Sequence, residues 1–168
     1  MKEKVYTIPS IWDMTILEGV ADYKGYPHHF CILDPEDGED GFFSDKYKLI
    51  LLTYEIFDLE MKSWAHWLHW LDMSQKGIHI PHSVDYAKAR KEISYEQVNF
   101  DNCHFTQQEK ELAEQNYQSE LIVKNYLRKA APLPYQVKGV FQGSTDFSSK
   151  TENLFVEWFD LLERNIIE

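Results

Sequence analysis

The pattern of apolar and polar positions near the start of the chain predicts a β-hairpin over residues 14–33. Two segments with strand composition flank Lys24 and Gly25, and a glycine there supplies the positive φ of a tight turn. If these two residues form the loop, the register follows from the alternation of side chains along each strand. Gly19 then lies opposite Phe30, so that an aromatic ring covers bare backbone.

Two further stretches have the character of strands. The continuous apolar run Leu49–Leu52 predicts a strand over residues 47–54, although a helix of similar length would give the same run. A late strand is expected over residues 135–142. Residues 78–105 show no clean period, and only a short helix over 86–93 can be suggested within them.

Helical spacing of apolar residues predicts three more elements. Asp58 is the expected N-cap of a helix that reaches about Met73 and stops before Gly77. A capping box at residues 106–109 opens a second helix, and another at residues 149–152 opens a last one. The apolar stripe of that last helix comprises Leu154, Phe155, Trp158, Leu161 and Leu162.

This order of elements predicts an α+β fold. A small antiparallel sheet, made of the N-terminal hairpin with a middle and a late strand, is expected to pack with three or four helices. The length of 168 residues fits a single domain spanning 1–168, and no linker is visible.

Charge and composition narrow the choice of partner. The chain has 28 acidic and 17 basic residues, a net charge of −11. Such a field repels phosphate groups, which disfavours nucleic acid and anionic membranes, and it favours a basic protein partner. The ten Tyr, ten Phe and five Trp residues suit a core or an interface equally. With two cysteines and no apolar run of membrane-spanning or signal-peptide type, the cytoplasm is the expected location.

The hairpin register brings together one set of residues able to do chemistry. Glu18, Asp22, His29 and Cys31 are predicted to share a face, with Cys31 opposite Glu18 and His29 diagonal to both acids. A thiol beside an imidazole that is held by a carboxylate is an arrangement that makes a nucleophile. Alternation alone, however, also places polar residues on an exposed sheet face.

A second candidate is a metal site. His66 and His69 stand three residues apart on the predicted helix, so both rings reach one side of it, and a divalent metal would need a third ligand. His79, His82 or His104 could supply that ligand. The alternative is that two histidines on a polar helix face are simply solvated, and no other cofactor is expected.

A third candidate is an interaction surface. Trp70 lies at the border of the apolar stripe of its helix, where a large aromatic side chain can reach a partner. The acidic loop at residues 34–45 contains Asp37, Glu39 and Asp40, but its spacing does not match a calcium-binding EF-hand loop.

These observations favour a non-enzymatic, cytosolic protein-interaction module that presents an acidic, aromatic-rich surface to a protein partner. No phosphate-binding glycine loop and no serine-hydrolase elbow occurs in the sequence. The alternative is an enzyme or ligand-binding domain that uses either the Glu18, Asp22, His29 and Cys31 face or a metal held by His66 and His69. Self-association stays open.

Overall fold

The computed structural model describes residues 1–12, 15–33, 45–78, 80–81, 106–143 and 151–161. The chain divides into two compact units, each of which is described by itself below. One unit comprises residues 1–57 and 129–168, and the other comprises residues 58–128.

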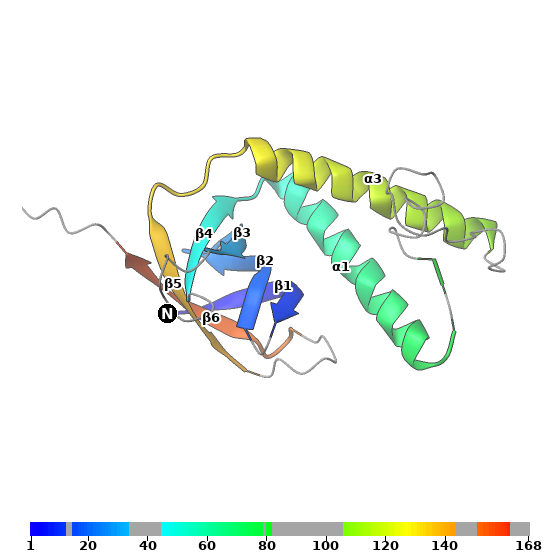
Figure 1. Cartoon of the computed structure of the whole chain (residues 1–168), viewed down its shortest axis with the longest axis horizontal. Coiled ribbons are helices and arrows are strands. Elements are labelled where there is room, and N and C mark those ends of the chain that lie inside the picture. Colours follow the sequence, from blue (N-terminus) through cyan, green and yellow to red (C-terminus); the bar gives the residue numbers. More distant parts are fainter. Residues whose placement is uncertain (13–14, 34–44, 79, 82–105, 144–150, 162–168) are drawn as a thin grey trace, which may run out of the picture. The chain divides into compact units, whose positions relative to one another are not determined.

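The first unit is a closed antiparallel β-barrel (Figure 1). Its strands follow the chain in order around the barrel, and pairing of the first strand with the last closes it. A closed barrel leaves no strand edge exposed for pairing with other chains. The strands are β1 (Lys2–Trp12), β2 (Thr15–Tyr23), β3 (Tyr26–Ile32), β4 (Lys46–Leu51), β5 (Gln136–Gln142) and β6 (Phe155–Leu161).

The predicted β2–β3 hairpin is confirmed with its register. Gly19 pairs with Phe30, and Tyr23 pairs with Tyr26. Lys24 and Gly25 form the turn with φ values of 52° and 82°. Two positive φ angles are those of the turn that matches the twist of antiparallel strands.

Aromatic rings fill the interior of the barrel. Phe30, Tyr47, Phe141 and Trp158 lie in mutual contact, with ring centroids 5.5 to 5.9 Å apart. The hydroxyl of Tyr47 donates to the carbonyl oxygen of Ile16 at 2.6 Å, so its polar end is satisfied inside the barrel. Part of the aromatic excess in the sequence therefore serves the core.

Two long helices carry the chain from β4 to β5. Helix α1 (Tyr54–Gln75) begins five residues earlier than predicted, because Thr53 rather than Asp58 caps it: the Thr53 side-chain oxygen accepts from the amide of Ile56 at 3.3 Å. Helix α3 (Gln107–Lys129) begins as predicted, and the Thr106 hydroxyl accepts from the Glu109 amide at 3.1 Å. Neither helix is long and apolar enough to cross a membrane.

The predicted α+β fold with three or four helices is wrong. The structure is a closed barrel of antiparallel strands, and its described part contains two helices. The short helix suggested at residues 86–93 lies outside the described residues.

The clearest error is the last predicted helix, whose residues form strand β6 instead. The stripe of apolar residues fits a helical period, but the same residues also alternate. Trp158 contacts the core rings, whereas Phe155 and Phe159 are exposed. Ser149, the capping residue expected for that helix, lies outside the described residues, and the hydroxyl of nearby Thr151 donates to the carbonyl of Tyr6 on β1 at 3.0 Å.

Strand β1 was not predicted at all. Its register against β2 shifts at several points, including the stretch between Thr7 and Ser10 that contains the exposed Pro9. A proline cannot donate to a sheet ladder, so within strands it is found at bulges and edges. The irregular pairing therefore accommodates Pro9, a residue type that is unfavourable in a regular strand.

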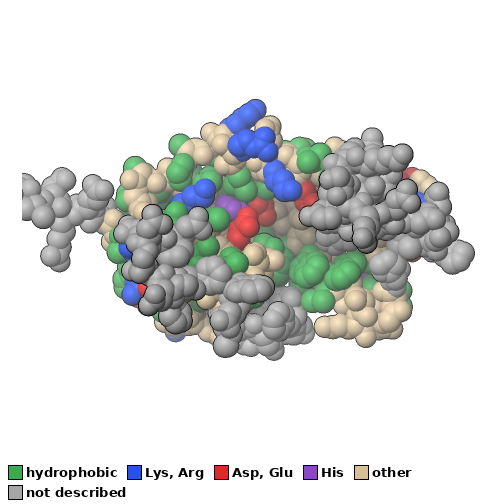
Figure 2. All heavy atoms as spheres, viewed as in Figure 1, with side chains coloured by type: hydrophobic (Ala, Val, Ile, Leu, Met, Phe, Trp, Pro, Cys, Tyr) green, Lys and Arg blue, Asp and Glu red, His purple; other side chains and the backbone are tan. Residues whose placement is uncertain are grey.

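Large apolar side chains also reach the surface. Figure 2 shows hydrophobic side chains in separate patches, next to acidic and other polar groups, on the face viewed there. The exposed apolar side chains on α3 and on the last two strands are those of Leu112, Leu121, Ile122, Val140, Phe155, Phe159 and Leu161.

Candidate functional site

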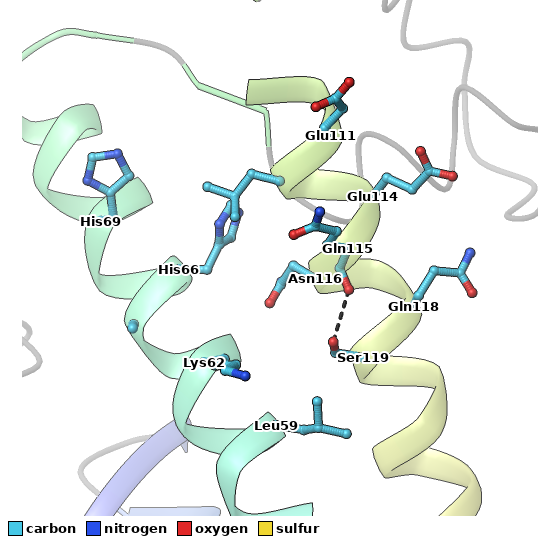
Figure 3. Close-up of a pocket in the computed structure, with 12 residues that line it drawn as sticks. Leu59, Lys62, His66, His69, Glu111, Glu114, Gln115, Asn116, Gln118 and Ser119 are labelled. Carbon is cyan, nitrogen blue, oxygen red and sulfur yellow. Dashed lines mark hydrogen bonds between the residues drawn. The ribbon is translucent and has the colours of Figure 1, made fainter. Parts of the chain in front are cut away.

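A groove of about 840 Å³ runs between helices α1 and α3 (Figure 3). The residues that line it are Leu59, Lys62, Ala65, His66 and His69 from α1, and Glu111, Leu112, Glu114, Gln115, Asn116, Gln118 and Ser119 from α3.

Two buried polar side chains lie inside the groove. His66 extends from α1 toward α3, and Asn116 extends from α3 toward α1 (Figure 3). Each is only 7% exposed. The Asn116 amide nitrogen donates to a carboxylate oxygen of Glu120 at 3.2 Å, which holds the side chain in place.

Apolar side chains supply much of the remaining wall. Leu59 and Ala65 contribute from α1, and Leu112, which is 46% exposed, contributes from α3. Ile122 stands two helical turns after Gln115 on the same side of α3 and is 54% exposed. Exposed aliphatic residues next to a groove commonly mark a binding surface.

The charge around the groove is negative. Glu111 and Glu114 lie on its α3 side (Figure 3). Lys62 lies on its α1 side, but its ammonium is paired with the Asp58 carboxylate at 2.9 Å. The groove therefore combines apolar wall residues with carboxylates on its α3 side.

The two histidines predicted to hold a metal both line this groove. His66 is buried, whereas His69, one turn further along α1, is exposed. Within the described ranges, no three His, Cys, Asp or Glu side chains are grouped so as to hold a metal ion. The three histidines proposed as further ligands lie outside those ranges, so the metal site stays a prediction.

The predicted sheet-face set lies on the outer side of the barrel. His29 Nε2 is 3.0 Å from a carboxylate oxygen of Glu18, and Cys31 pairs in register with Glu18. The Cys31 thiol contacts the carbonyl of Ile32 at 3.7 Å. A carboxylate that orients an imidazole is half of a nucleophile arrangement, and the role of the thiol stays a prediction.

The fourth member of that set, Asp22, has a different partner. Its carboxylate accepts a hydrogen bond of 3.0 Å from the Tyr6 hydroxyl. Burial, followed by this bond, raises the pKa of Tyr6 to about 12. Asp22 thus favours the neutral form of Tyr6. It pairs in register with Pro27, two residues before His29 on β3.

The predicted interaction residues are only partly described. Trp70 is half-buried, and its ring stacks on that of Trp67, with centroids 5.2 Å apart and planes at 14°. Asp37, Glu39 and Asp40 lie outside the described residues.

The sequence did not indicate the groove itself. Asn116 is a polar residue at a buried position, which the sequence pattern of α3 does not predict. The sole signal was the helical period that predicted both helices. The period of each helix predicts its apolar side, but it does not predict which other helix lies against that side.

Comparison of this chain with protein-family models, with curated proteins and with solved structures finds no match.

Proposed function

We propose that this protein is a non-enzymatic interaction module that binds a basic, amphipathic helix of a partner protein in the α1–α3 groove. The observation that carries the proposal is an apolar groove between two helices with carboxylates on its rim. An amphipathic helix laid into such a groove is a recurring mode of recognition.

The apolar face of the partner helix would contact Leu59, Ala65 and Leu112, which removes exposed hydrocarbon from water. Its lysine or arginine side chains would flank this face and approach Glu111 and Glu114. Opposite charges placed across an interface orient the partner and exclude acidic competitors.

The charge of the whole chain supports the same class of partner. A net charge of −11 attracts a basic segment over a distance and raises the rate of encounter, an effect that weakens with salt. Helix α1 shares this sign, because it contains four acidic residues and Lys62 is its single basic residue.

The test uses a synthetic two-heptad peptide of leucine, alanine and lysine at helical spacing, titrated into the full chain by calorimetry. The matched control peptide has glutamate in place of every lysine. We expect saturable binding of the lysine peptide, weaker at high salt, and no measurable binding of the glutamate peptide.

Two double variants locate the binding. Glu111→Gln with Glu114→Gln should weaken the lysine peptide several-fold, since it removes the rim carboxylates. Glu55→Gln with Asp72→Asn neutralises the same number of acids on α1 outside the groove and should have a smaller effect. Equal binding of both peptides, or equal effects of both double variants, would contradict the proposal.

A further inference from the structure

The barrel has a cleft of its own, which no sequence motif indicated. Its volume is about 900 Å³, and it is formed by the start of β1, the end of β2 with the following turn, and β6. It lies entirely in the barrel unit and is independent of the α1–α3 groove.

Aromatic side chains form the walls of this cleft. Phe155 and Phe159, on β6, are 39% and 45% exposed, and Trp158 and Tyr23 complete the set. The indole N–H of Trp158 donates to the Asp22 carbonyl at 2.9 Å, which fixes that ring. Exposed aromatic rings beside a cleft suit an aromatic or apolar ligand body.

Charges of both signs surround these rings. The carboxylates are those of Glu3, Asp22 and Asp160, and the cations are Lys2, Lys4, Lys24 and the N-terminal ammonium of Met1. The cleft is thus close to electrically balanced, in contrast to the strongly acidic chain as a whole.

One pair of opposite charges is loosely held. Lys24 Nζ lies 3.6 Å from Asp160 Oδ2, which is an ion pair but too long for a good hydrogen bond, and the two side chains are 66% and 31% exposed. The other oxygen of Asp160 is fixed, because it accepts from the Tyr23 hydroxyl at 2.7 Å. Tyr23 in turn is 2.7 Å from the Tyr135 hydroxyl, which must donate to it.

We propose that this cleft binds a free α-amino acid with an aromatic side chain. The ligand ammonium pairs with Asp160 Oδ2, its carboxylate pairs with Lys24, and its ring lies against the exposed rings of Phe155 and Phe159. A zwitterion inserted in this way replaces one loose ion pair by two charge-assisted hydrogen bonds. A ligand with a single charge would separate Lys24 from Asp160 and satisfy one of them.

The test is a titration of the ¹⁵N-labelled full chain, followed by NMR at the indole N–H of Trp158. The probe is L-phenylalanine, and the controls are 2-phenylethylamine, which lacks the carboxylate, and 3-phenylpropanoate, which lacks the ammonium. We expect L-phenylalanine to saturate the signal about tenfold more tightly than either control.

Variants identify the contacts. Asp160→Asn and Lys24→Gln should each weaken L-phenylalanine binding about tenfold. Asp72→Asn on α1 and Lys76→Gln directly after α1 should leave it unchanged. Asp160→Asn also disturbs the hydrogen bond to Tyr23, so a second variant is needed. Phe159→Ala changes an exposed side chain, leaves that hydrogen bond in place and should also weaken L-phenylalanine binding. The proposal is overturned if L-phenylalanine causes no shift up to about 10 mM, if the one-charge analogues bind equally, or if Lys24→Gln leaves binding unchanged or strengthens it.

Discussion

At the position of Gly19, strand β2 has no room for a side chain. A Cβ atom there would lie 2.0 Å from the backbone oxygen of Thr7 and 2.8 Å from the ring of Phe30. The first of these neighbours is backbone of the adjacent strand, which cannot rotate away. A glycine inside a strand often marks such a close approach.

We therefore expect Gly19→Ala to lower the free energy of unfolding by about 1–3 kcal/mol, measured by urea denaturation. Lys48→Ala, at an exposed position on β4, is the control and should change the free energy of unfolding by about 0.5 kcal/mol or less. A Gly19→Ala protein as stable as the control would show that β1 and β2 are not this close.

His28 should make the barrel sensitive to acid. Its ring is 5% exposed and meets Tyr23 edge-on, and Nδ1 donates to the Tyr26 carbonyl at 2.7 Å. Burial lowers the pKa of His28 below 6.5, although the Tyr26 bond and nearby acids partly oppose this. As pH falls below 6.5, the unfolded chain binds a proton at His28 more readily than the folded chain does. The free energy of unfolding therefore decreases in that range.

Replacing His28 by asparagine keeps a donor for the Tyr26 carbonyl and removes the titration. We expect the free energy of unfolding of His28→Asn to fall less between pH 7 and pH 5 than that of the parent protein (roughly the range over which a histidine titrates). Identical pH dependence in the two proteins would mean that His28 is not the group responsible.

Tyr47 should make the free energy of unfolding depend on pH in the alkaline range. Burial raises its pKa from 10.0 to about 12. Unfolded tyrosine ionises at a lower pH than the folded side chain, so the stability due to Tyr47 is complete below pH 10 and is lost as pH rises toward 12. The free energy of unfolding of Tyr47→Phe should therefore depend less on pH above 10 than that of the parent, whatever the cost of losing the hydroxyl. A parallel decline in both proteins would contradict this assignment.

At the scale of elements, the start of helix α1 depends on one side chain. Thr53 satisfies the amide of Ile56, and its carbonyl accepts from the amide of Phe57 at 2.9 Å. Thr53→Ala should cost about 1 kcal/mol in the free energy of unfolding, whereas Thr53→Ser should restore most of it. The corresponding change at Asp58, the N-cap expected from the sequence, should cost less, because Asp58 lies within the helix and pairs with Lys62 at the surface. Equal costs at both positions would place the cap elsewhere.

The elements also show why some were predicted and others were not. The β2–β3 hairpin carries its own turn and alternation, and α3 carries its own cap, so both are local in sequence. Strand β6 has no such local support. It is a strand because β5, the preceding strand, and β1, at the other end of the described sequence, pair with it on both sides.

For the whole molecule, the barrel is built from two separate parts of the chain. Residues 58–128 leave it after β4 and return before β5. The closing pair of strands, β1 and β6, lies at opposite ends of the described sequence. The prediction of a single domain over 1–168 can be tested on this arrangement.

We expect a chain in which residues 58–128 are replaced by a short Gly/Ser linker to fold into the barrel alone. Its near-ultraviolet circular dichroism should retain the signal of the packed rings of Phe30, Tyr47, Phe141 and Trp158, because all four belong to the barrel unit. Trp158→Phe in the same shortened chain is the control that assigns part of that signal. Loss of the signal on excision would show that the two units fold only as one domain.

The sequence by itself determined those features whose interactions are local. It determined the β2–β3 turn and register, the cap and period of α3, the helical character of α1, and the acidic balance that favours a basic partner. Tertiary structure decided the rest, because it depends on segments far apart in the chain. Closure of the barrel made a strand of residues with helical spacing, the facing of α1 and α3 made a groove, and the meeting of β1, β2 and β6 brought Lys24, Asp160 and the exposed rings together. Hydrophobic burial has no direction of its own, so a local pattern can predict an element but not the partner against which it is buried.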